Sequence, residues 1–164
     1  MRVYLPATAA ELSALGTSPE SLDGLNLAGR YAHGVTKRLA GGLPDMDQDE
    51  LEWEAFVAAT IDAAALLVAD PAAPPMRVVL SLDVPDSAIN ETAANDLGQL
   101  STVQLQPVKG GAVAAIHVEE PASSQLLQNL RANPDSASAQ AAVLDADLLW
   151  YDPSELNEIP IPHV

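Results

Sequence analysis

Hydrophobic and polar residues follow strand-like and helix-like periods in turn along most of this chain. Short apolar runs predict strands, and the clearest is residues 77–83 (RVVLSLD). Longer runs with apolar residues three and four positions apart predict helices. The expected strands are 2–5, 30–35, 77–83, 102–108, 114–118 and 148–151. The expected helices are 8–15, 47–69, 121–133, 136–144 and a last one that starts at 152–155. Residues 86–100 are expected to form a loop.

The starts of three expected helices share one local signal, a capping residue followed three positions later by Glu. Such a pair satisfies two backbone N–H groups that the first helical turn leaves without partners. The pattern predicts a strand followed directly by a helix at both ends of the chain. The three pairs are Thr8 with Glu11, Asp47 with Glu50, and Asp152 with Glu155.

Strand and helix alternate without long segregation, which favours an α/β or α+β fold. We expect a mixed, largely parallel sheet of about five strands, covered by helices in a two-layer arrangement. A length of 164 residues fits one domain, here 1–164. Within it, 159–164 is an expected extended tail, because Pro160 and Pro162 prevent a helix. Its Ile159 and Ile161 must cover either the chain's own helices or a second subunit, and we favour the second subunit.

The longest expected helix, 47–69, has a wide apolar stripe that is typical of packing on a sheet. The stripe is flanked by Phe56, Thr60, Ala63 and Leu67, and acidic side chains lie opposite it. The stripe holds Trp53, Val57, Ile61, Ala64 and Val68, and the opposite side holds Glu52 and Asp62.

The formal net charge of −16, with only seven Lys and Arg, argues against binding to nucleic acid or to an anionic membrane. The acidity fits a basic partner, a cation, adaptation to high salt, mimicry of nucleic acid, or solubility alone. No apolar run approaches the ~20 residues of a membrane span, and the first strand begins at residue 2, which leaves no room for a signal peptide. We therefore expect a cytoplasmic protein.

Asp45, Asp47 and Asp49 have the spacing of a calcium-binding loop, which uses oxygen ligands at alternate positions. The rest of the loop does not fit, because Glu50 stands where a Gly is needed and Phe56 where a bidentate Glu belongs. Attraction of carboxylates to a helix N-terminus explains the cluster better. The chain has no Cys, so thiolate sites are excluded. We expect no metal and no cofactor; residues 109–111 (KGG) predict a turn rather than a phosphate-binding loop.

His117 lies within an expected strand, and strand alternation places Glu119 on the same face. One interpretation is a structural His at a sheet edge. The other is a small enzyme or ligand-binding protein with its site at the carboxyl ends of the strands. In that case Asp83 or Glu119 is the base and His117 the acid or orienting group. The candidate ligand-binding residues are Thr8, Asp83, His117, Glu119 and Tyr151.

Trp150 and Tyr151 close the last expected strand and face opposite sides of the sheet. If Tyr151 faces outward beside the tail, an exposed apolar surface remains, and such surfaces often bind partners. With no catalytic motif in the sequence, the first hypothesis is a non-enzymatic protein-interaction module, acting with a protein partner or as a homodimer. The enzyme or ligand-binding site around His117 is the alternative.

Five segments, taken in order, resemble a small actinobacterial family of uncharacterised single-domain proteins: MRVYLPAT, ELEWEAFVAA, RVVLSLDVP, AAIHVEE and LLWYDPSELNEIP. The resemblance spans essentially the whole chain. It implies a cytoplasmic bacterial protein and brings no activity with it. The chain departs from the family pattern at Asp152, where a short non-acidic residue follows the WY pair in other members.

Overall fold

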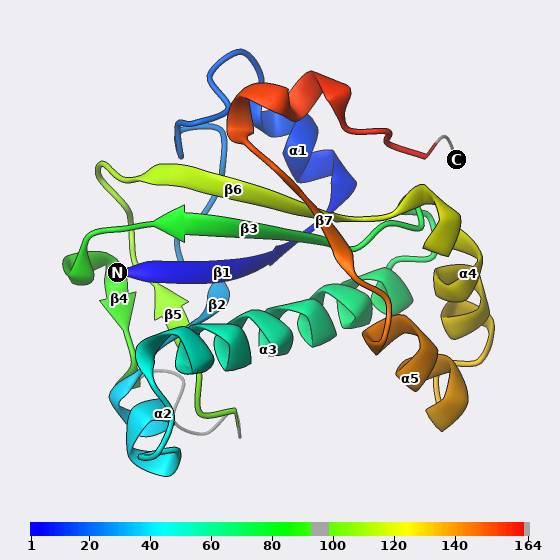
Figure 1. The fold of residues 1–164 in the computed structure, drawn as a ribbon. Coiled ribbons are helices and arrows are strands. Elements are labelled where there is room, and N and C mark those ends of the chain that lie inside the picture. The colour runs from blue at the N-terminus through cyan, green and yellow to red at the C-terminus, as the bar shows by residue number, and fades with distance from the viewer. Residues whose placement is uncertain (93–98, 163–164) are drawn as a thin grey trace.

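The computed structural model describes residues 1–92 and 99–162 and shows a seven-stranded sheet with helices on both faces (Figure 1). The strands are β1 (Arg2–Ala7), β2 (Tyr31–Gly34), β3 (Val78–Asp83), β4 (Ile89–Asn90), β5 (Thr102–Leu105), β6 (Ala112–Glu119) and β7 (Leu148–Tyr151). The α-helices are α1 (Ala9–Leu15), α2 (Lys37–Gly42), α3 (Gln48–Ala69), α4 (Ser124–Ala132) and α5 (Ala137–Leu144). Short 3-10 helices are η1 (Asp86–Ala88), η3 (Pro121–Ser123) and η4 (Pro153–Glu158).

The sheet has the order β4-β5-β2-β1-β3-β6-β7, and each neighbouring pair is antiparallel. The fold is therefore α+β, and the prediction of a largely parallel sheet of about five strands was wrong. α3 does join two strands that run in the same direction, β2 and β3, but β1 lies between them and runs the opposite way. The continuous apolar run of β3, typical of parallel strands, arises instead because helices cover both faces of an antiparallel sheet.

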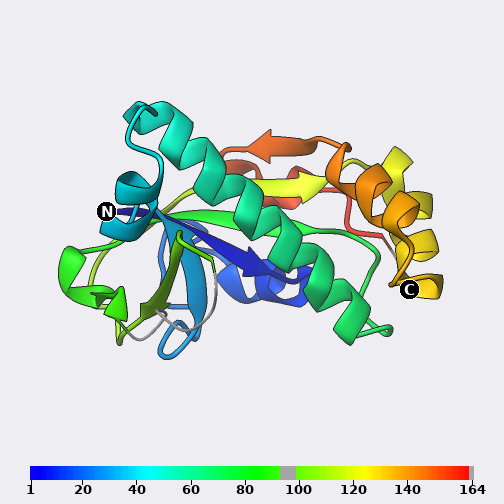
Figure 2. The same cartoon turned by 90° about the horizontal axis from the view of Figure 1, so that it is seen from below.

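α3 crosses one face of the sheet diagonally (Figure 2). Its closest contact is an alanine row, Ala55, Ala59 and Ala63, in which every residue is fully buried against Tyr4 and Val79. Small side chains let the helix approach the strands closely. The centre of the predicted stripe is thus displaced from the true contact, and Trp53 and Ile61 are 60% and 40% exposed.

The opposite face of the sheet carries the larger apolar core, covered by α1 and by the chain after β7. The sheet is therefore the middle of three layers, which corrects the expected two. Ile159 is only 7% exposed within this core, and Ile161 packs against it. The described part of the tail covers the chain's own core. These two side chains are therefore not left uncovered for a second subunit, as the sequence had suggested.

Local signals located the helix starts well. The carboxylates of Glu11, Glu50 and Glu155 accept hydrogen bonds from the backbone N–H of the capping residue three positions earlier. The segment after Asp152 forms the 3-10 helix η4. The expected loop 86–100 contains η1 and β4, and its residues 93–98 lie outside the described part of the chain. Gly110 and Gly111 adopt positive φ angles in the expected turn.

None of the helices in the described ranges is long and apolar enough to cross a membrane.

Candidate functional site

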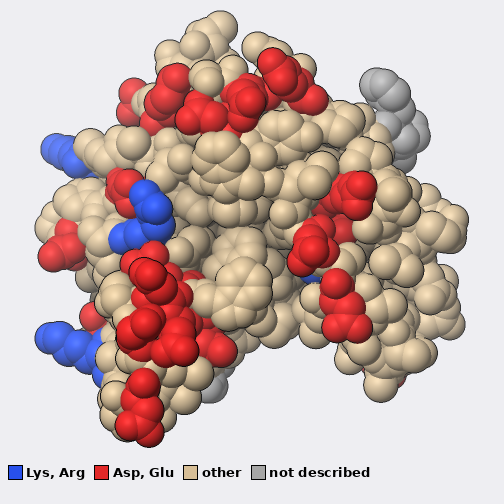
Figure 3. Space-filling model, viewed as in Figure 1, with Lys and Arg blue, Asp and Glu red and all other residues tan. Residues whose placement is uncertain are grey.

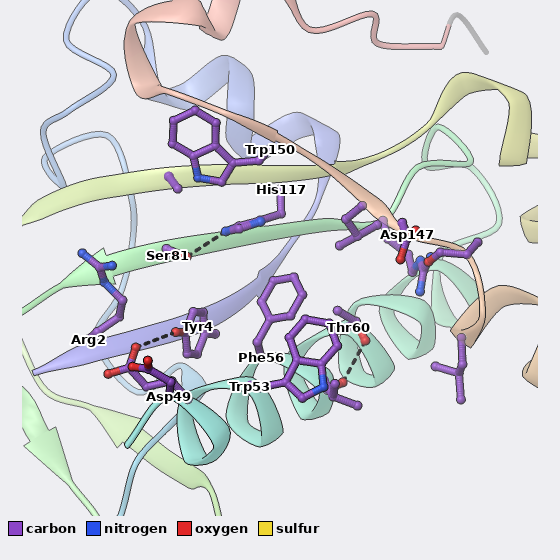
Figure 4. Close-up of a pocket in the computed structure, with 17 residues that line it drawn as sticks. Arg2, Tyr4, Asp49, Trp53, Phe56, Thr60, Ser81, His117, Asp147 and Trp150 are labelled. Atoms are coloured by element: carbon purple, nitrogen blue, oxygen red, sulfur yellow. Dashed lines mark hydrogen bonds between the residues drawn. The ribbon is translucent and has the colours of Figure 1, made fainter. Parts of the chain in front are cut away.

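A groove of about 690 Å³ opens on the face of the sheet that α3 crosses. Strands β1, β3 and β6 supply its floor, α3 forms one wall, and β7 with the segment before it forms the other (Figure 4). The side chains that shape its centre are Tyr4, Trp53, Phe56, Ser81, His117 and Trp150.

Aromatic side chains are concentrated at this groove. The chain has two Trp, one Phe and three Tyr, and both Trp, the Phe and one Tyr line it. The ring centroid of Phe56 lies 5.6 Å from that of Tyr4, 5.6 Å from that of Trp53 and 4.7 Å from that of His117. These spacings are those of favourable aromatic pairs. Phe56 therefore packs against three other ring side chains, those of Tyr4, Trp53 and His117.

The two Trp side chains stand on opposite walls of the groove, with Phe56 and His117 between them (Figure 4). Trp53 of α3 is 60% exposed and Trp150 of β7 is 59% exposed. Tyr151, in contrast, packs against the core on the other face of the sheet. The exposed aromatic residue of β7 is thus Trp150, and the hypothesis of an outward-facing Tyr151 was wrong.

His117 lies on the floor of the groove and is hydrogen-bonded to Ser81 of β3, with 2.9 Å between His117 Nε2 and Ser81 Oγ. Burial lowers the pKa of His117 from 6.5 to about 4, and the positive charge of Arg2 adds to this effect. The imidazole is consequently neutral near pH 7. A neutral ring can pack against Phe56, to which it is tilted by 56°, and share a hydrogen bond with Ser81 without adding charge to the groove.

Glu119 forms a buried ion pair with Arg77, which lines the groove close to Ala146. The Arg77 Nε–Glu119 Oε2 distance is 2.6 Å, and the two side chains are 1% and 2% exposed. Arg77 also donates from Nη2 to the Ala146 carbonyl oxygen at 2.8 Å. The pair therefore fixes the segment that leads into β7, and its charges are already balanced.

Asp83 is engaged in a similar way at the other end of the floor. Its carboxylate accepts two hydrogen bonds from the Arg2 guanidinium, at 3.0 and 2.8 Å. These bonds hold the pKa of Asp83 below its usual value. Beside this pair, the Tyr4 hydroxyl donates to Glu52 at 3.3 Å. Burial, followed by the charge of Glu52, raises the pKa of Tyr4 to about 12.

Three carboxylates lie along the groove without a basic partner among the described residues: Asp49, Glu52 and Asp147. Asp49 and Asp147 lie toward opposite ends of the groove (Figure 4). On this face of the molecule, red carboxylates flank an uncharged centre and basic side chains are sparse (Figure 3). Within residues 1–92 and 99–162, no three His, Asp or Glu side chains are grouped so that they could hold a metal ion.

A second polar cluster lies on the other side of α3, around His33 of β2. His33 is fully buried, with Nδ1 2.9 Å from Ser101 Oγ and Nε2 3.0 Å from Asp62 Oδ2. The three residue types are those of a hydrolytic triad. Ser101 is only 4% exposed, however, so a substrate cannot reach its hydroxyl. The cluster instead connects α3 to β2 through the hydrogen bond between Asp62 and His33. Asp62 was predicted to lie on the side of the helix that faces away from the sheet, and this contact shows that it does not.

The five residues proposed from the sequence do not gather at one place. His117 lines the groove, while Asp83 and Glu119 face the same side of the sheet but are held by arginines. Thr8 caps α1, and Tyr151 lies on the opposite face. In an antiparallel sheet the carboxyl ends of neighbouring strands point to opposite edges, so the expected convergence has no structural basis.

Sequence reasoning missed Trp53, Phe56 and Ser81 as site residues. Trp53 and Phe56 belong to the segment ELEWEAF, in which Trp53 stands between Glu52 and Glu54. A Trp flanked by acidic residues on a helix of small core residues was a usable signal for an exposed aromatic. Ser81 could not be found in this way, because it meets His117 only through the pairing of β3 with β6.

A comparison with protein-family models matches residues 1–159 to DUF6912, described as a family of unknown function. No curated protein matches the chain, and no solved structure does. The match covers nearly the whole length, including every strand and helix that forms the groove. The chain therefore belongs to DUF6912, a family of unknown function.

Proposed function

We propose that this chain is a non-enzymatic protein-interaction module and that its contact site is the groove between α3 and β7. The observation that carries the proposal is the exposure of Trp53 and Trp150 on opposite walls of one groove. Trp is among the residues most enriched at the energetic centres of protein interfaces. The chain has only six aromatic residues, yet both of its Trp are more than half exposed. Exposed apolar side chains of this size are typical of a surface that a binding partner covers.

The expected occupant is a segment of a different protein rather than a second copy. Two copies with a net charge of −16 each repel one another. Among the basic side chains, Arg2, Arg30, Arg77 and Arg131 already donate hydrogen bonds within their own chain. A second copy therefore has few cations to place against an acidic groove. An actinobacterial, cytoplasmic setting remains part of the proposal, resting on the sequence alone.

The two Trp provide a direct test, because the indole N–H region of a ¹⁵N spectrum then reports only on the groove. The protein is titrated with a basic, an acidic and an uncharged apolar peptide of equal length. A peptide held in the groove shifts both indole signals, and Trp150→Ala weakens its binding. Tyr31→Ala, an exposed aromatic of β2 outside the groove, is the matched control and leaves binding unchanged.

Two results would overturn this proposal. If every peptide leaves both indole signals in place, the groove is not the contact site. If both signals instead move as the protein alone is concentrated, and light scattering shows twice the monomer mass, the occupant is a second copy.

A second candidate function, a small enzyme or ligand-binding protein, is favoured by one observation. The Ser81 hydroxyl and the His117 imidazole are hydrogen-bonded on the floor of an open groove, as a nucleophile and its base would be. Two features weigh against it. A His with a pKa near 4 is a weak base at neutral pH, and Ser81 is only 3% exposed.

A fluorophosphonate probe, which labels activated serines, separates the two candidates. An interaction module is not labelled. Labelling that disappears in both Ser81→Ala and His117→Gln would establish the Ser–His pair as a reactive site and favour the enzyme. Ser87→Ala, an exposed serine outside the groove, is the matched control.

A further inference from the structure

We infer that the group held in the groove is the cationic side chain of an Arg or Lys from a basic segment of the partner. This inference rests on the proposed function and adds the chemistry of the bound group. It follows from three features of the groove: its unpaired carboxylates, the neutralised state of its own cations, and the arrangement of its aromatic rings.

The carboxylates set the sign of the charge that the groove accepts. Asp49 and Asp147 are exposed and lie toward opposite ends, and their carboxylates make no hydrogen bond or ion pair with any described residue. Glu52 lies beside Asp49, one turn before Phe56. Among the described residues, its carboxylate accepts hydrogen bonds from two neutral groups, the Tyr4 hydroxyl and the Gln48 amide. An anionic segment would be repelled by all three, whereas a cation between them is attracted from both ends.

The cations that line the groove are each paired with a carboxylate, which weakens their repulsion of a bound cation. Arg2 is held by both carboxylate oxygens of Asp83, and Arg77 is held by both oxygens of Glu119. His117 is neutral at pH 7 because its pKa lies near 4. The unbalanced charge of the groove is therefore negative.

The aromatic walls distinguish a cationic side chain from a bound metal ion or a purely apolar one. A guanidinium or ammonium group is attracted to the negative face of an aromatic ring, most strongly to that of Trp. Trp53 and Trp150 present such rings from the two walls, and Phe56 lies between them. The aliphatic stem of Arg or Lys can pack on the same rings while its head group faces the carboxylates. An apolar side chain would use the rings and leave the carboxylates unpaired.

The test compares an Arg-Gly repeat peptide with the same peptide in which citrulline replaces each Arg. Citrulline keeps the shape of the side chain and removes its charge. At ~0.15 M ionic strength, where distant charges are screened, we expect the citrulline peptide to bind at least about ten-fold more weakly. Trp150→Ala weakens the Arg-Gly peptide by about five-fold or more, and Tyr31→Ala does not.

Charge variants separate a local site from the general acidity of the chain. Asp49→Asn with Asp147→Asn weakens the Arg-Gly peptide by about three- to ten-fold. Asp135→Asn with Glu158→Gln removes the same charge at exposed positions outside the groove and leaves binding within about two-fold. Equal losses in the two double variants would mean that net charge alone attracts the peptide, which would overturn the inference.

The remaining outcomes distinguish this inference from the proposed function. If the citrulline peptide binds as tightly and shifts both indole signals, the groove is a contact site but does not select a cation. If the Arg-Gly peptide binds while both indole signals stay in place, the inference and the proposed site both fail. Failure of the Arg-Gly peptide to bind overturns only the inference. The titration with basic, acidic and uncharged apolar peptides then decides whether the groove is a contact site at all. Free arginine binding as tightly as the peptide would overturn the choice of a protein segment.

Discussion

The buried Arg77–Glu119 pair gives the sharpest prediction about stability. In Glu119→Gln the side chain keeps its shape but loses its charge, so the Arg77 guanidinium stays buried without a counter-charge. Removing one partner of a buried ion pair costs about 3–5 kcal/mol, and we expect the lower end because the Gln carbonyl still accepts one hydrogen bond. A loss of about 3 kcal/mol is large against a total of about 5–15 kcal/mol for a protein of ordinary stability.

Urea unfolding and thermal melts measure this loss. At about 2–4 °C per kcal/mol for a chain of this size, the melting temperature falls by roughly 6–12 °C. Glu120→Gln is the matched control, since Glu120 is the exposed neighbour of Glu119 and has no ion pair among the described residues. It should cost less than about 0.5 kcal/mol.

A double variant, Arg77→Met with Glu119→Leu, tests the cause of the loss. The double variant removes both charges together, so we expect it to be more stable than Arg77→Met or Glu119→Leu alone. It still loses the hydrogen bond that Arg77 donates to the Ala146 carbonyl, at a cost of about 1–3 kcal/mol. If Glu119→Gln costs no more than Glu120→Gln, the pair is not buried in solution and the reasoning is refuted.

Three further predictions concern a titrating group, the tail and the net charge. His117 has a folded pKa of about 4, below its ordinary 6.5, so the unfolded chain binds more protons than the folded chain between these pH values. The free energy of unfolding is therefore at its full value above about pH 6.5 and falls by up to about 3 kcal/mol as the pH drops to 4. This loss disappears in His117→Gln. Deleting residues 159–164 lowers the melting temperature without changing the mass seen by light scattering, because Ile159 is buried in the chain's own core; a changed mass with an unchanged melt would contradict this. Sodium chloride raises the melting temperature by screening the net charge of −16, and a flat series would mean that the carboxylates are already neutralised.

The sequence was most informative where a structural feature depends on neighbouring residues. A helix start is decided within four residues, and the pairs Thr8 with Glu11, Asp47 with Glu50, and Asp152 with Glu155 each form the expected backbone contact. The positions of most strands were predicted for the same reason. These local signals do not say which strands become neighbours. β1 lies between β2 and β3, and pattern alone gave no indication of that arrangement.

The candidate site was only partly predictable because its residues meet through long-range pairing. His117 stood out in the sequence, but its partner Ser81 is 36 positions away on β3. Trp53 was assigned to the contact stripe because the helical period was centred on it, whereas the actual contact is centred on the alanine row Ala55, Ala59 and Ala63. Small residues contribute little to the hydrophobic pattern of a sequence. In the packed structure, however, they decide where a helix and a sheet approach each other most closely.

Fluorescence quenching tests the central claim, an acidic groove walled by two exposed Trp, most directly. Caesium and iodide ions both quench indole emission but carry opposite charges, and the signal comes only from Trp53 and Trp150. At matched ionic strength, we expect strong quenching by caesium and weak quenching by iodide relative to free N-acetyltryptophanamide, and Asp49→Asn with Asp147→Asn should reduce the difference. Poor quenching by both ions would show that the Trp side chains are covered. Iodide quenching as strong as that by caesium would show that the groove is not acidic. Either result would contradict an acidic groove walled by two exposed Trp.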